Sequence, residues 1–254
     1  MPVATVELKS PKEIGLMRDA GAVVAAVLGA VSRAVAAGVS TAELDRIAAV
    51  ETRKRGARPA FLGYRGYPAT LCASINEEVV HGIPSPDRLL KTGDIVSLDF
   101  GVVLNGFFAD AAVTVGVGEL APEVRALLQA TREALDKGID AMRPESRVGD
   151  VSAAVQRHVE SRGFSVVRSF VGHGIGRALH EDPPVPNFGK AGTGLRLAPG
   201  MTLAVEPMVN MGGHDVRVLS DGWTAVTRDG KWSAHFEHTV AVTSGEPEIL
   251  TVER

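Results

Sequence analysis

The sequence predicts an α+β protein in which helices cover one face of a largely antiparallel sheet. Two helices followed by strand-like segments occur in the first half of the chain, and the same order recurs in the second half. Apolar, β-prone runs with hairpin turns lie between these helices. Helices on one side of an antiparallel sheet are a stable way to bury such elements. The repeated order further predicts two pseudo-symmetric halves.

Capping signals define the helices of the first half. Residues 10–13 (Ser-Pro-Lys-Glu) have the form of a capping box with proline at the first helical position, and the periodic apolar residues that follow continue to about Ala37. A second capping box at residues 40–43 opens a helix that ends near Gly56.

The second half repeats this pattern. Pro122 opens a third helix, residues 150–163 predict a fourth, and the apolar run over 164–171 predicts a strand. Aligning Gly56 with Gly163 places the second helix of each half in register, although their side chains share little identity.

Composition limits the function classes. The net charge is −3 and the basic residues are dispersed, so there is no electrostatic footprint for nucleic acid or anionic lipid. With 45% hydrophobic residues and no Pro/Gly/Ser-rich linker, we expect one domain over 1–254, with a short extension over 1–9.

The chain also lacks signals for export. Cys72 is the only cysteine, which excludes an intramolecular disulfide and favours a reducing compartment. There is no leader pattern, and the longest mostly apolar stretch, Ala22 to Ala37, is too short for a membrane span. These features predict a soluble, cytoplasmic protein without membrane contact.

Four carboxylates and one histidine lie in apolar or glycine-rich segments, where a charged side chain is costly. Two divalent cations would balance four negative charges, and a neutral imidazole would add a ligand without changing the sum. A two-metal hydrolytic site is therefore our leading hypothesis. Each residue alone has a structural alternative, as a turn or edge-strand residue. The five are Asp99, Asp110, His173, Glu206 and Glu237.

A hairpin brings the first two carboxylates together. Asn105 and Gly106 separate two β-prone runs, 95–103 and 107–115, and Asn-Gly is a strong signal for a two-residue turn. In that register Asp110 faces Gly101 and Asp99 is its diagonal neighbour on the same face. We expect Gly101 to leave room for the ions.

Other catalytic motifs are missing from the sequence. The glycines around His173 lack the spacing of a dinucleotide-binding loop, and there is no GxSxG, HExxH or CxxC motif. Cys72 has no base beside it in sequence, which favours a buried structural thiol.

The chain as a whole resembles the type I methionine aminopeptidases. The segments that carry the resemblance are GYRGYPATLCASINEEVVHGIP (63–84), GDIVSLDFGVVLNGFFADAAVTV (93–115), VGHGIGRALHEDPPVPNFG (171–189), GMTLAVEPMV (200–209) and WTAVTRDGKWSAHFEHTV (223–240). The resemblance implies the pita-bread fold, removal of the N-terminal methionine from nascent proteins and peptides, and a preference for a small, uncharged second residue.

The resemblance also assigns the metal ligands. It implies that Asp99 chelates one metal, that Asp110 and Glu237 bridge both, and that His173 and Glu206 complete the other. Oxygen donors with one nitrogen suit Mn²⁺, Fe²⁺, Co²⁺ or Zn²⁺.

Catalytic roles follow from the same resemblance. It implies that Glu206 shuttles a proton, that His180 donates to the scissile carbonyl oxygen, and that His81 contacts the substrate backbone. The implied methionine pocket is apolar and polarizable, which suits a thioether. The implied lining residues of this pocket are Tyr64, Tyr67, Cys72, His81 and Trp223. At two further positions of the pocket, Phe61 and Leu179, this chain has a different residue type from many bacterial relatives.

Two further groups of residues come from the comparison with the family. Backbone carbonyls around Asn76 and Glu78, with Ser233, resemble a monovalent-cation site. His158 and His214 are expected to be ordinary surface residues. His235 and His238 flank Glu237 and are expected to support it, and of these two only His238 fits the family motif.

The implied partners are nascent polypeptide N-termini, with any ribosome contact made by the surface of a monomeric catalytic domain. Alternatives are a proline-specific relative, a type II enzyme and a binding protein that has lost catalysis. The first usually carries an additional N-terminal domain, and the second needs an insertion between His173 and Glu206 for which this chain has no room. The third lacks ligands, whereas all five are present here.

Overall fold

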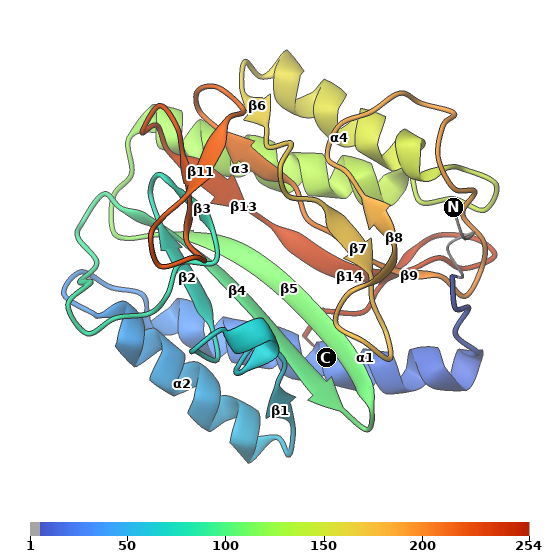
Figure 1. The fold of residues 1–254 in the computed structure, drawn as a ribbon, viewed down its shortest axis with the longest axis horizontal. Coiled ribbons are helices and arrows are strands. Elements are labelled where there is room, and N and C mark those ends of the chain that lie inside the picture. The colour runs from blue at the N-terminus through green and yellow to red at the C-terminus, as the bar shows by residue number, and fades with distance from the viewer. Residues whose placement is uncertain (1–5, 254) are drawn as a thin grey trace.

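The computed structural model describes residues 6–253 and confirms the α+β class, with four α-helices and a short 3₁₀ turn in that range. Figure 1 shows α3 and α4 over one half of the molecule and α1 and α2 over the other. The helical elements are α1 Pro11–Ala34, α2 Thr41–Lys54, η1 Tyr64–Gly66, α3 Pro122–Asp140 and α4 Val148–Ser161.

The strands form one large sheet and two small ones. The nine-stranded sheet has the order β1-β4-β5-β14-β9-β7-β8, with β2 paired to β4 and β15 to β14, and all of these pairings are antiparallel. Its strands are β1 Arg58–Pro59, β2 Cys72–Ile75, β4 Ile95–Leu104, β5 Phe107–Gly116, β7 Gly172–Gly174, β8 Glu181–Val185, β9 Thr202–Val205, β14 Glu237–Ala241 and β15 Glu248–Ile249. The small sheets are β13-β10-β6 and β11-β12-β3, formed by β3 Glu78–Val80, β6 Ser165–Val166, β10 Met208–Asn210, β11 Val216–Val218, β12 Ala225–Thr227 and β13 Ser233–His235.

Capping explains where the first two helices begin. The Ser10 backbone N–H donates to the Glu13 carboxylate over 2.7 Å and the Glu13 N–H donates to Ser10 Oγ, so the predicted capping box is present. The second box is only half formed. Ser40 Oγ accepts from the Glu43 N–H, but the Glu43 carboxylate pairs with Arg46 instead.

Two predictions for the second half need correction. The fourth helix begins at Val148, before the predicted start, because Asp150 accepts from the Arg147 backbone N–H and caps the earlier turn. The apolar run 164–171 forms only the short strand β6, which pairs with Val209 and Asn210 of β10.

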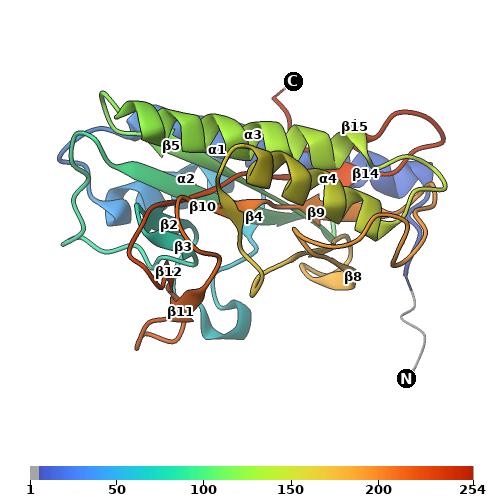
Figure 2. The same ribbon diagram turned by 90° about the horizontal axis from the view of Figure 1, so that it is seen from above.

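Each half packs its helices on the same face of the large sheet. Residues of α1 and α2 form one apolar core with the even-numbered residues of β4, and α3 and α4 form another with β9 and β14. Figure 2 shows α1, α3 and α4 along one side of the sheet, opposite β8, β11 and β12. Gly56 and Gly163 each lie just after a helix, and both have positive φ. This correspondence supports the predicted duplication.

The helix α1 is long and apolar enough to cross a membrane by length and composition, contrary to our estimate from the sequence. In the fold its apolar residues, including Val24, Val27 and Val31, are buried against the sheet. Its composition is therefore explained by its place in the core.

Two glycines of α1 give a matched test of this packing. A Cβ at Gly21 would lie 2.2 Å from the Leu250 carbonyl oxygen, whereas one at Gly15 would meet only Arg18, at 3.9 Å. We expect Gly21→Ala to lower the free energy of unfolding by about 1–3 kcal/mol. Gly15→Ala should raise it by roughly 0.5–1 kcal/mol through helix propensity alone. Urea denaturation of both variants checks this, and equal effects would contradict the packing described.

Candidate active site

The β4–β5 hairpin has the predicted register. Gly101 pairs with Asp110 around a turn in which Asn105 and Gly106 both have positive φ, as a type I′ turn requires. A Cβ at Gly101 would lie 3.0 Å from the Phe61 ring and 3.2 Å from the Cβ atoms of Ala60 and Asp110, so the glycine makes room for these side chains. Room for ions at this position stays a prediction.

Strand register gathers the candidate ligands on the face opposite the helices. Asp99 and Glu237 both pair with Ala112 of β5, which places the two carboxylates in one row across the sheet. Asp110 lies in the next row of paired residues across the sheet. In that row, Thr239 and His173 both pair with Ala204 of β9.

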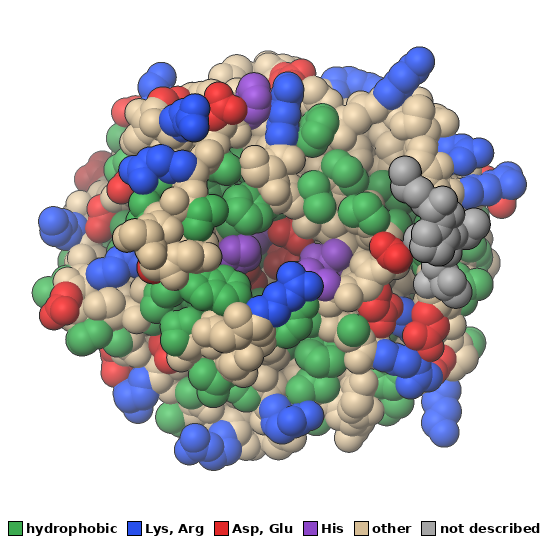
Figure 3. Space-filling model, viewed as in Figure 1, with side chains coloured by type: hydrophobic (Ala, Val, Ile, Leu, Met, Phe, Trp, Pro, Cys, Tyr) green, Lys and Arg blue, Asp and Glu red, His purple; other side chains and the backbone are tan. Residues whose placement is uncertain are grey.

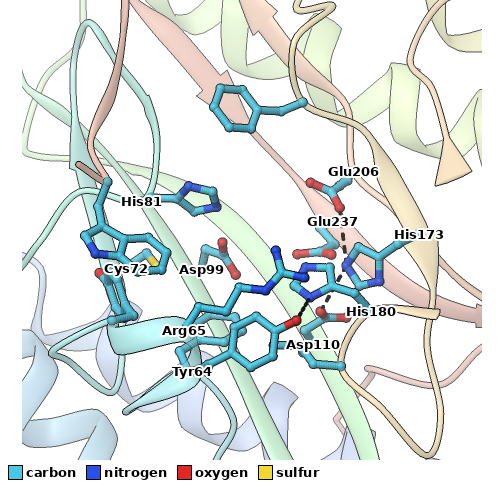
Figure 4. A pocket seen from close by; sticks show the side chains of 15 residues that line it. Tyr64, Arg65, Cys72, His81, Asp99, Asp110, His173, His180, Glu206 and Glu237 are labelled. Atoms are coloured by element: carbon cyan, nitrogen blue, oxygen red, sulfur yellow. Dashed lines mark hydrogen bonds and ion pairs between the residues drawn. The ribbon is translucent and has the colours of Figure 1, made fainter. Parts of the chain in front are cut away.

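The side chains from these rows converge, as Figure 4 shows. Single donor atoms of Asp110, His173 and Glu237 all lie within 4.8 Å of one another, and all three residues are buried. His173 Nε2 is 3.6 Å from an oxygen of Asp110 and 3.6 Å from one of Glu206. Asp99 and Glu206 line the same cavity, so all five predicted ligands come together.

Burial makes the negative charges of this cluster unfavourable. It raises the pKa of Asp99, Glu206 and Glu237 well above the usual range, and their mutual repulsion acts in the same direction. Burial also raises the pKa of Asp110 to about 7, although a hydrogen bond from Thr239 opposes the shift.

His173 is held as a neutral imidazole. Its Nδ1 lies 2.8 Å from the Gly174 carbonyl oxygen, which can only accept, so the ring proton is on Nδ1 and the Nε2 lone pair faces the carboxylates. Burial lowers the pKa of His173 to about 4, which keeps the imidazole uncharged at neutral pH.

This donor set fits divalent cations. Among residues 6–253, no Lys or Arg forms an ion pair with any of the four carboxylates. Their ion-pair partners among these residues are the imidazoles of His173 and His235, which burial keeps neutral. Four clustered carboxylates with one imidazole therefore need positive charge from outside the chain. Oxygen donors with one nitrogen are suitable ligands for first-row divalent metals.

A cavity of about 300 Å³ lies beside the cluster, and most of its wall is apolar or aromatic. Trp223 packs edge-on against Tyr67 with ring centroids 5.1 Å apart, and Cys72 is buried next to them. The Tyr67 hydroxyl donates to backbone carbonyls, which fixes this wall in place. All the predicted pocket residues line this cavity, including Phe61 and Leu179.

Two histidines stand on opposite sides of the cavity. His81 has a positive φ of 61° and packs edge-on against Phe170 and Trp223. The His180 ring centroid lies 4.2 Å from that of His173, and its Nδ1 is 2.8 Å from the Tyr64 hydroxyl. Figure 3 shows acidic side chains at the base of this hollow, between histidines and surrounded by hydrophobic side chains.

Several residues at the site were missed from the sequence. Arg65 and Phe170 line the cavity. Thr239 Oγ1 lies 3.1 Å from Asp110 Oδ1, and Asn187 donates to the Glu206 backbone carbonyl over 3.0 Å. Thr239 could have been found, because it lies two residues after Glu237 and so shares its face.

The remaining histidines correct one expectation. His238 points to the helix face, where it contacts Thr251, because neighbouring residues of a strand alternate between faces. His235 is instead the near neighbour, with Nε2 at 3.8 Å from Glu206. His158 is half-buried and contacts Glu133, so it is not an ordinary surface residue, whereas 43% of the His214 side chain is exposed.

The residues expected around a monovalent cation lie near one another. Ser233 donates its backbone N–H to the Asn76 carbonyl over 2.9 Å, and Asn76 also has positive φ. The Glu78 carboxylate forms an ion pair with Arg88 and accepts a hydrogen bond from the Ile75 N–H. The cation itself stays a prediction.

Comparisons with known proteins agree with this geometry. A profile of metallopeptidase family M24 matches residues 15–244. The chain is 53% identical to the methionine aminopeptidase of Clostridium perfringens, over 96% of this chain and 98% of that protein. It is 49% identical to methionine aminopeptidase 1 of Bacillus subtilis, with the same coverage.

Solved structures share the fold. The methionine aminopeptidase of Thermotoga maritima superposes with a TM-score of 0.97 at 48% identity, over 98% of this chain and 100% of that one. The prolidase of Pyrococcus furiosus gives 0.77 at 20% identity, over 97% of this chain but 66% of that one, which is a likeness of fold. The predicted pita-bread fold is therefore confirmed, and the chain belongs to metallopeptidase family M24, among its methionine aminopeptidases.

Proposed function

We propose that this chain removes the N-terminal methionine from nascent proteins and peptides by hydrolysis at a two-metal site. The observation that carries the proposal is the convergence of five donors at the base of one cavity whose walls are mostly apolar. Full-length similarity to methionine aminopeptidases supports methionine as the residue removed.

The five donors divide between two cations. Asp99, at one end of the first row, would bind one ion, and Asp110 and Glu237, near the centre, would bridge both. His173 and Glu206 would complete the second ion. When bound, divalent cations activate a water molecule and polarise the scissile carbonyl. Mn²⁺, Fe²⁺, Co²⁺ and Zn²⁺ all accept this donor set.

The protein's own groups would move and hold protons around the reacting bond. Burial lowers the pKa of His180 to about 4, so its ring carries a single N–H. If the Tyr64 hydroxyl donates to Nδ1, that N–H is on Nε2, where it would donate to the scissile carbonyl oxygen. Glu206, whose pKa is raised, would take a proton and pass it to the leaving amine.

The aromatic wall would hold the methionine side chain. Tyr67, Cys72 and Trp223 offer a rigid, polarizable surface for a thioether, and His81 would contact the substrate backbone. Phe61 lies over Gly101 in the wall of this cavity. We include a preference for a small, uncharged second residue in the proposal, as the family resemblance implies.

We further propose that the chain works as a single-domain monomer in the cytoplasm, where nascent N-termini are available. The lone Cys72, which is buried, and the net charge of −3 support this setting. Any ribosome contact would come from the surface of the catalytic domain. We retain a monovalent cation near Asn76 and Ser233 as part of the proposal.

A direct assay compares two peptides. Metal-reconstituted protein should cleave Met-Ala-Ser and leave Ala-Pro intact, because the cavity is built for a long apolar first side chain. Product release is followed by mass spectrometry. Cleavage of Ala-Pro alone would instead identify a proline-specific peptidase.

Two histidine variants separate chemistry from metal binding. His180→Ala should lower kcat on Met-Ala-Ser by roughly 100- to 1000-fold while retaining metal, because it removes a donor to the developing oxyanion. His173→Ala should lose metal, since it removes a ligand. Metal analysis by mass spectrometry with steady-state kinetics checks both, and metal loss in His180→Ala would contradict the assigned roles.

Metal affinity should depend on pH. Because the pKa of Asp110 is raised to about 7, protons compete with metal as the pH falls through that value. We expect the affinity of metal-free protein for Mn²⁺ to fall at least roughly tenfold from about pH 8 to about pH 6. Isothermal titration calorimetry measures this, and an affinity that is constant over the range would contradict a carboxylate site with raised pKa values.

A further inference from the structure

The segment before α1 is docked on the turn that carries His180. Lys9 is only 5% exposed, and its backbone N–H donates to the Gly200 carbonyl over 2.7 Å. Its ammonium group donates to the Glu7 carbonyl and to the Glu181 carboxylate, which directly follows His180 in the chain.

Glu181 transmits this contact to the turn. One carboxylate oxygen accepts from Lys9, while the other accepts from the backbone N–H groups of Arg177, over 2.6 Å, and Ala178, over 3.1 Å. A single half-buried carboxylate thus ties the two ends of the turn 176–181 to one lysine.

The close fit at Gly176 shows that this contact includes the lysine stem. A Cβ at Gly176 would meet the Lys9 side chain, so the turn backbone lies directly against the methylene groups of the lysine. Gly176 also accepts from the Phe108 N–H over 2.7 Å, which anchors the turn to the β4–β5 hairpin. Arg177 pairs with Glu7 and Glu13 on the exposed side.

We infer that Lys9 is a positioning residue for His180. The His180 side chain lines the open cavity, and within the described chain its ring has one hydrogen bond, to Tyr64. Its place beside His173 is therefore set by the turn, and the Lys9–Glu181 pair fixes the turn. This inference rests on the proposed function, because the role of His180 belongs to it.

The primary test is the variant Lys9→Met, which keeps the apolar stem and removes the charge. Displacement of a catalytic group by about 1 Å can cost roughly 100-fold in rate, so we expect kcat on Met-Ala-Ser to fall roughly tenfold or more. KM and metal content should be unchanged. Lys12→Met is the matched control, because Lys12 is exposed in the first turn of α1 and should leave kcat unaltered.

A double-mutant cycle separates positioning from general stability. In a His180→Ala background, Lys9→Met should cause no further loss of kcat, because the group it positions is gone. An equal loss in both backgrounds, or a loss of metal, would overturn the inference. Failure of the proposed function looks different, since the wild-type protein would then not cleave the methionyl peptide.

A second variant applies if Lys9→Met does not fold. Lys9→Met combined with Glu181→Gln buries no unpaired charge and keeps an oxygen for the turn amides. It should show the same loss of kcat and the same dependence on His180. Lys9→Arg, which retains charge and donors, should recover most of the activity. If the double variant kept full kcat and Lys9→Arg did not recover activity, a positioning role would be contradicted.

Discussion

The rest of the site depends on four carboxylates that share one buried region and form no ion pair with a Lys or Arg side chain among the described residues. Desolvation raises their pKa values, and their ion-pair partners are neutral imidazoles. The folded protein thus contains an uncompensated site that divalent cations would neutralise. The same groups that are unfavourable without metal are the ones that would bind and activate it.

The two faces of the large sheet have different roles in holding these carboxylates. One face of the large sheet packs against all four helices and supplies the apolar cores, while the other face carries the polar rows. Because strand residues alternate, Phe100 and Ala111 stabilise the fold directly beside Asp99 and Asp110. A rigid sheet can therefore hold charged ligands in fixed positions. His180 lies on a turn outside the strands, where we infer that the Lys9–Glu181 pair supports it.

Sequence reasoning succeeded where the controlling interaction is local. The Asn-Gly turn fixed the hairpin register, and the capping residues fixed the start of α1. It failed where distant segments meet. Phe61 occupies the space opposite Asp110, His235 approaches Glu206, and Lys9 contacts Glu181, which is far from it in sequence. These contacts do not follow from spacing along the chain, because each joins segments that meet only in the folded protein. His238, in contrast, turns away because it directly follows Glu237 on the same strand, which spacing could have predicted.

The central claim is that the five gathered side chains hold two cations side by side. Anomalous diffraction from crystals grown with Mn²⁺ tests it most directly. The account predicts two peaks in the cavity, both touching Asp110 and Glu237, with Asp99 on one ion and His173 and Glu206 on the other. Peaks that lie outside this cluster, or a cavity that binds no metal while the carboxylates stay together, would contradict it.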